Sequence, residues 1–157
     1  MRTKPSGIEH GPKPLHLIAR LSSDHLPVLG RHHVYDLPLI YGMCYDGCNL
    51  DYRVDVGNKI ELLKLSPTHS SDDWPYPNYP SLLPYVPLQI ADERSASYAE
   101  FAERFYNMPE QQTTELVVAV PNHATLGISL WGRPSAVTIV FECDLADRMV
   151  YAFNVCD

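Results

Sequence analysis

The segment Cys44-Tyr45-Asp46-Gly47-Cys48 holds the residues whose types and spacing are best suited to chemistry. Thiolates bind zinc, attack electrophiles and form disulfides, so two neighbouring thiols could belong to a metal site, a nucleophilic site or a disulfide. A nucleophilic site would also need a base and a group that orients the base. Cys44 with His123 as the base and Asp46 as the orienting group is the candidate catalytic set, and Arg133 could bind an anion beside it.

The turn between the two cysteines decides whether they can act together. Asp46-Gly47 is a favoured dipeptide for a two-residue hairpin loop, because both positions of a type I′ turn need positive φ. The register that this turn sets gathers apolar and aromatic pairs on one face: Tyr45 with Cys48, Met43 with Leu50, Tyr41 with Tyr52 and Leu39 with Val54. Because successive side chains of a strand alternate between faces, Cys44 and Cys48 are expected to point apart. They would then share no metal ion and form no disulfide, and Cys48 would be a core residue.

No other pattern indicates a metal, a cofactor or a familiar catalytic motif. His32 and His33 are adjacent and would point apart in an extended chain, and Cys143 and Cys156 are expected near strand ends on different faces. The chain has no Walker loop, no GxSxG, no HExxH and no GxGxxG. We therefore predict no cofactor and no bound metal, and we interpret the cysteines as ordinary buried or edge thiols.

Composition and charge predict one globular domain. With 157 residues, of which 45% are hydrophobic and 20% charged, the chain is long enough for one packed core. A net charge of −7 without a Lys/Arg cluster argues against a nucleic-acid partner. No run approaches the roughly 18 apolar residues that span a bilayer, and the start lacks the apolar region of a secretory signal. We expect no membrane partner and a cytoplasmic protein with reduced thiols; no pattern indicates an oligomeric state.

The hydrophobic pattern predicts an α+β fold, in which residues 15–157 form a single domain after a flexible leader at 1–14. Ser97 and Glu100 fit a capping box at the start of a helix. Apolar side chains follow at helical spacing, namely Tyr98, Phe101, Ala102 and Phe105. We predict one amphipathic helix from this pattern, and residues 21–36 are interpreted mainly as loop.

Antiparallel strands are expected to make up the rest of the domain. A first strand at 15–20 precedes the hairpin meander, whose third strand covers 60–65. The loop Gly57-Asn58-Lys59 would place Val54 opposite Leu62. A C-terminal meander is expected to contain four strands, at 115–120, 124–131, 136–143 and 149–156. Alternation predicts the core-facing residues of its last two strands to be Val137, Ile139, Phe141, Cys143, Met149, Tyr151, Phe153 and Val155.

The segment from Ser66 to Pro87 is rich in proline and aromatic residues and is expected to lack regular secondary structure. Rigid aromatic side chains are common at recognition sites, because they bury a large area with little loss of conformational entropy. The residues expected to contact a partner are Asp72, Asp73, Trp74, Tyr76, Tyr79 and Tyr85. The alternative is that these rings fold back over the edge of the sheet.

Two functions from different classes are compatible with these patterns. The first is a non-catalytic protein-binding module of the immunity or inhibitor type, which presents the acidic and aromatic segment to a more basic protein. The second is a small enzyme or small-ligand-binding protein that uses Cys44 and His123. The absence of the common catalytic motifs and the negative charge favour the first function.

Overall fold

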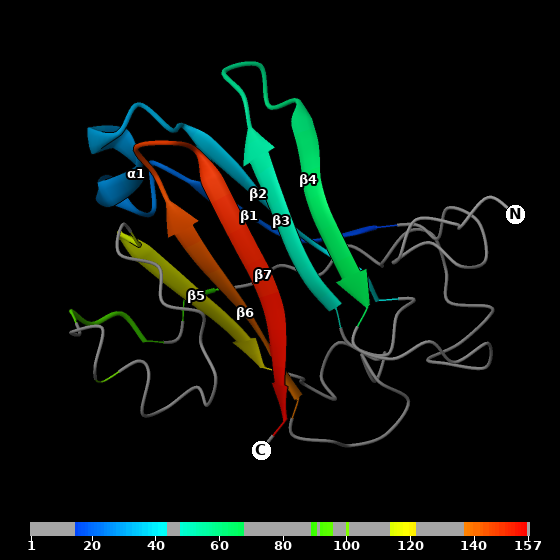
Figure 1. Cartoon of the computed structure of the whole chain (residues 1–157). Coiled ribbons are helices and arrows are strands. Elements are labelled where there is room, and N and C mark those ends of the chain that lie inside the picture. The colour runs from blue at the N-terminus through cyan, green and yellow to red at the C-terminus, as the bar shows by residue number, and fades with distance from the viewer. Residues whose placement is uncertain are drawn as a thin grey trace, which may run out of the picture.

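The computed structural model describes residues 15–43, 48–67, 89–90, 92–95, 100, 114–121 and 137–156. These residues contain β1 (His16–Ser22), α1 (Pro27–Arg31), β2 (Asp36–Tyr41), β3 (Cys48–Val54), β4 (Ile60–Pro67), β5 (Leu116–Pro121), β6 (Val137–Asp144) and β7 (Met149–Cys156). β1 and β2 form a two-stranded sheet, and the other strands form a five-stranded sheet in the order β4-β3-β7-β6-β5 (Figure 1). Every described pairing is antiparallel, so the expected fold class is confirmed.

The two sheets lie one behind the other and enclose the main core between them (Figure 1). Two buried tyrosines bond the layers together. The Tyr52 hydroxyl, from β3, donates to Pro38 O at 2.9 Å and accepts from Ile40 N at 3.1 Å, both in β2. The Tyr41 hydroxyl, from β2, accepts from Cys48 N at 3.0 Å. These phenols satisfy backbone groups that would otherwise be buried without partners, so they fix how the layers stack.

The expected hairpin between residues 39 and 54 is wrong, because β2 pairs with β1 and belongs to a different sheet from β3. The face expected to be apolar is nevertheless buried, and its buried residues include Leu39, Tyr41, Met43, Cys48, Leu50, Tyr52 and Val54, although Ile40 on the other face of β2 is buried as well. Two strands packed face to face bury the same alternate residues as two strands paired edge to edge. Alternation therefore identified the buried side chains and could not identify the neighbouring strand. Residues 44–47, which include the Asp-Gly turn, lie outside the described part of the chain.

The turn between β3 and β4 is longer than expected. Val54 pairs with Ile60, which leaves a loop at 55–59 in place of the three-residue loop. The Asp55 carboxylate accepts from the backbone N–H groups of Gly57 and Lys59, both at 2.9 Å, and Asn58 takes a positive φ of 58°. These bonds stabilise a wider turn.

The C-terminal strands also differ from the expected meander in their order. β5 pairs directly with β6, and β6 with β7, whereas the run at 124–131 lies outside the described residues. On β6, Ile139, Phe141 and Cys143 face the main core as expected. On β7 the face assigned to the main core was wrong, since Val150 and Ala152 join the main core, whereas Phe153 is buried in a smaller cluster on the other face. β7 is apolar on both faces, so its sequence offers no alternation to choose between them.

Helical structure was located only in part. α1 falls within a segment interpreted mainly as loop, and its five residues are too few to show helical periodicity. Its usable signal was Pro27 at the first turn, where a missing N–H costs nothing. Of the helix expected after Ser97, the structure describes Glu100 alone, which is helical. In the described ranges, no helix has the length and apolar character needed to cross a membrane.

Candidate functional site

The residues chosen from the sequence as site residues lie outside the described part of the chain. This holds for the candidate catalytic pair, Cys44 and His123, and for the residues expected to contact a partner, Asp72, Asp73, Trp74, Tyr76, Tyr79 and Tyr85. The structure describes the two strands between which the proline-rich and aromatic segment 66–87 lies in the sequence. β4 ends at Pro67 at one edge of the five-stranded sheet, and β5 begins at Leu116 at the opposite edge (Figure 1).

The two cysteines that the structure describes in full are unreactive by environment. Cys48 and Cys143 are both free and fully buried. Burial disfavours the thiolate and raises the pKa of Cys48 to about 11. Burial also raises the pKa of Cys143, and the nearby carboxyl of Glu142 raises it further. The expectation that Cys48 is a core residue is confirmed, and neither thiol is a ready nucleophile.

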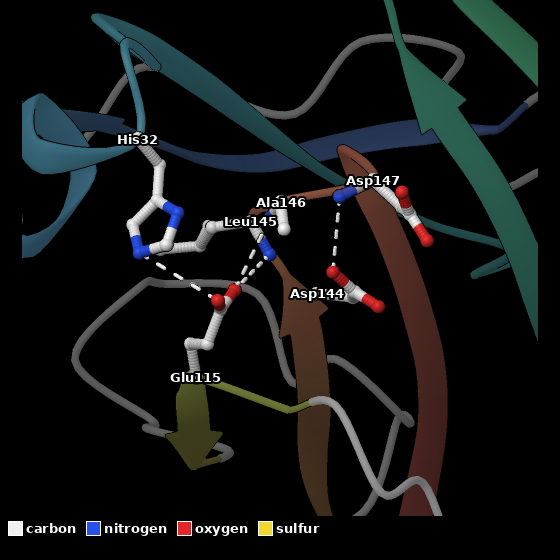
Figure 2. A network of polar contacts seen from close by, with 6 residues as sticks. All are labelled: His32, Glu115, Asp144, Leu145, Ala146 and Asp147. Atoms are coloured by element: carbon white, nitrogen blue, oxygen red, sulfur yellow. Dashed lines mark hydrogen bonds and ion pairs between the residues drawn. The ribbon is translucent and has the colours of Figure 1, made fainter.

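One polar cluster lies at the end of the five-stranded sheet where β6 turns into β7 (Figure 2). Glu115, directly before β5, extends its carboxylate to this turn. Its Oε2 accepts from the backbone N–H of Leu145 at 2.6 Å and from that of Ala146 at 3.2 Å. Its Oε1 lies 3.6 Å from Nε2 of His32, which forms an ion pair when the imidazole is protonated. We call Glu115, His32, Leu145 and Ala146 the turn cluster.

Two further bonds hold the same turn. The Asp144 carboxylate accepts from the backbone N–H of Asp147 at 3.0 Å, and the Arg148 guanidinium donates to the backbone oxygen of His33 at 3.0 Å. The turn cluster therefore fastens β5, the β6–β7 turn and the segment after α1 to one another. Oε2 of Glu115 already accepts from two backbone N–H groups, so the role of this residue is that of a structural anchor.

A second set of polar groups lies on the face of the five-stranded sheet turned away from β1 and β2, which we call the distal face. Cross-strand pairing aligns Lys64 with Asp51, Asp51 with Tyr151, Tyr151 with Glu142, and Glu142 with Val117. A row of ionisable side chains thus runs from β4 to β6, followed by an apolar residue on β5. Burial raises the pKa of Asp51, and Lys64 opposes that rise. Burial and surrounding carboxylates raise the pKa of Tyr151.

Glu142 is the unusual member of this row. Its side chain has no exposed area, and among the described residues its Oε1 has no hydrogen-bond partner and its Oε2 has one long contact of 3.5 Å, with the hydroxyl of Thr114. Burial raises the pKa of Glu142 to about 7, and the bond from Thr114 offsets this only in part. A carboxyl in this state exchanges its proton near neutrality, as general acids and bases do.

Sequence reasoning missed both glutamates. Glu142 had one signal, since it stands alone among apolar residues between Phe141 and Cys143 in a strand that covers both faces. Glu115 had none, because its partners come from positions far along the chain. Within the described ranges, no group of three or more His, Cys, Asp or Glu side chains is arranged to hold a metal ion.

These two glutamates supply the site geometry, and comparison with known proteins adds no further constraint. No protein-family model, curated protein or solved structure matches this chain.

Proposed function

We propose that this protein is a non-catalytic protein-binding module of the immunity or inhibitor type, acting in the cytoplasm on a more basic protein. The observation that carries the proposal is the composition of the partner-binding segment, Asp72 to Tyr85, within a chain of net charge −7. Trp and Tyr side chains are the commonest anchors of protein interfaces, and complementary charge speeds the encounter with a basic partner.

The described scaffold supports such a role. The segment that contains these residues connects β4 to β5, which lie at opposite edges of a sheet held by antiparallel pairing throughout. β4 is itself accessible, with Leu62 and Leu63 exposed at 44% and 45%. A segment carried between two ordered strands suits recognition, because binding residues commonly lie on loops positioned by a rigid framework.

The two buried thiols also favour binding over thiol chemistry. Cys48 and Cys143 are held as neutral thiols by burial, so a catalytic role for cysteine would have to fall to Cys44 or Cys156. Thiol-reactivity profiling of the four single Cys→Ser variants examines that alternative directly. If Cys44→Ser alone abolishes a rapid reaction with a thiol probe at pH 7, the enzyme or ligand-binding hypothesis replaces the present proposal.

The main experiment is quantitative affinity capture with three forms of the protein: wild type, the double variant Trp74→Ala/Tyr76→Ala, and Val56→Ala. Val56 is 86% exposed in the β3–β4 turn, so its variant controls for the loss of exposed apolar surface outside the segment. We expect a basic protein to be recovered by wild type and Val56→Ala and reduced at least tenfold with the double variant, as loss of hot-spot residues predicts. Equal recovery with all three forms would contradict the proposal.

The charge part of the proposal has a test of its own. The double variant Asp72→Asn/Asp73→Asn should slow association with the recovered partner and weaken its dependence on salt, because rim charges act mainly on the rate of encounter. Unchanged association rates at low ionic strength would show that these two carboxylates do not face the partner.

A further inference from the structure

Glu142 is a buried carboxyl in the five-stranded sheet, and the inference drawn from it does not depend on partner binding. Glu142 lies on β6 with its side chain on the distal face, between Val117 of β5 and Tyr151 of β7. It is fully buried, and in the part of the chain that the structure describes it has one long hydrogen bond, to Thr114, while Oε1 has no partner there. An ionised carboxylate needs several donors, and a buried one that lacks them is costly. The neutral acid is therefore the form that this packing favours.

Among the described residues, no cation is paired with Glu142 to stabilise its ionised form. On its own strand, Asp144 lies two residues further along, and Cys143 points to the other face. The β7 side presents Tyr151, whose pKa is raised first by burial and then by the carboxylates of Asp144, Asp51, Asp147 and Glu142. The β5 side presents Thr114 and Val117, and β3 adds Asp51. The one cation that the described residues place in this row is Lys64 on β4, which lies opposite Asp51 and beyond Tyr151.

The apolar side chains around Glu142 give its ionisation a structural consequence. Val140 and Phe153 form a second buried cluster on the distal face, with Val117 and Val155 packed against it. Glu142 adjoins this cluster through Val117, its cross-strand neighbour. If the carboxyl loses its proton, Oε1 must gain a water molecule or leave the buried position, and either event disturbs the packing of the cluster.

We propose that Glu142 is a proton-controlled switch in the five-stranded sheet. As the neutral acid it stays packed on the distal face between β5 and β7, and as the carboxylate it draws water to that face and loosens it. The fold is then tighter in mildly acidic solution than in mildly alkaline solution. The linkage sign agrees: a carboxyl with a pKa of 4.5 unfolded and about 7 folded weakens folding as pH rises between those values.

The test compares urea unfolding of the wild type with that of Glu142→Gln, which has the shape of the neutral acid and cannot ionise. The ratio of folding constants, variant over wild type, should rise on the order of 50- to 100-fold between about pH 5 and pH 8. Glu61→Gln is the matched control, since Glu61 lies on the same sheet face and its side chain is 63% exposed. Its ratio should stay flat. A flat ratio for Glu142→Gln would overturn the proposal.

Hydrogen exchange of the wild type provides a test that needs no variant. After correction for intrinsic rates, the backbone amides of Phe141, Glu142 and Cys143 should lose at least tenfold more protection between pH 5 and pH 8 than the amide of Leu39, which lies in the other sheet. Unchanged protection of the three β6 amides between pH 5 and pH 8 would show that Glu142 does not control its surroundings, whether or not the variant folds.

Discussion

Glu115, directly before β5, and Glu142, on the adjacent strand β6, meet opposite environments. The Glu115 carboxylate accepts from two backbone N–H groups and lies close to a histidine, whereas Glu142 has one long contact and an oxygen without a partner. Glu115 reaches a turn, where N–H groups are not used by a neighbouring strand (Figure 2). Glu142 lies within the ladder, where β5 and β7 already take the backbone donors of β6.

The difference shows that the ionised form of a glutamate in this sheet is stabilised when backbone N–H groups of a turn lie within reach of its carboxylate. At the turn, the side chain completes an incomplete set of backbone hydrogen bonds. In the middle of a sheet no backbone donor remains, and a buried carboxyl holds its proton instead. The same residue type is therefore an anchor in one place and a titrating group in the other.

The largest expected effect follows from replacing Glu142 by leucine. The pKa of Glu142 rises from 4.5 to about 7, so its ionisation costs the folded state about 3 kcal/mol at pH 8. We expect Glu142→Leu to raise the free energy of unfolding by about that amount at pH 8, measured by urea denaturation, and by less at about pH 3, where the carboxyl is largely neutral in both states. A lower stability of the variant at pH 8 would contradict the claim that the ionised carboxyl of Glu142 destabilises the folded state.

The opposite effect is expected at the turn cluster. Glu115→Ala removes the acceptor of the Leu145 and Ala146 amides and should lower the free energy of unfolding by about 2 kcal/mol. The control is His32→Ala, which removes only a partly exposed contact at 3.6 Å and should cost less than about 1 kcal/mol. If both variants lose the same stability in thermal or urea denaturation, the backbone donors are not what anchors Glu115.

The smallest expected effect concerns the hydrogen bond between Thr114 and Glu142. The bond from Thr114 lowers the pKa of Glu142, so Thr114→Val should raise that pKa above its wild-type value. The free energy of unfolding should change by less than about 1 kcal/mol, because the bond is long and the residue is partly exposed. A carboxyl titration of this variant that coincides with the wild type would mean that the Thr114 hydroxyl does not bond to Glu142.

Local pattern was enough to locate most strands of this fold. The expected runs at 60–65, 115–120, 136–143 and 149–156 match β4 to β7 within two residues, because each is apolar and bounded by turn residues. Pairing could not be obtained in the same way. β2 and β3 are neighbours in sequence and bury matching faces, yet they lie in different sheets. Alternation predicts which face of a strand is buried. It does not predict whether the next strand pairs with it edge to edge or packs on it face to face.

The polar clusters escaped prediction for a related reason. Glu115 finds His32 and the β6–β7 turn through the tertiary fold, and no spacing in the sequence links them. Asp55, by contrast, bonds to amides two and four residues away, so its wider turn was in principle predictable from Asp55, Gly57 and Asn58. Glu142 is visible in the sequence as a polar residue in an apolar strand. The shortage of hydrogen-bond donors around its carboxyl depends on the tertiary fold and could not be predicted.

The most direct test of this account is a pH titration of the Glu142 side-chain carboxyl carbon by NMR, with Glu61 observed in the same sample. Glu142 is expected to titrate with a midpoint near 7, far above the ordinary value of 4.5. A midpoint near 4.5 would mean that its carboxylate finds donors or water in the fold, and the contrast between the turn cluster and the distal face would be refuted.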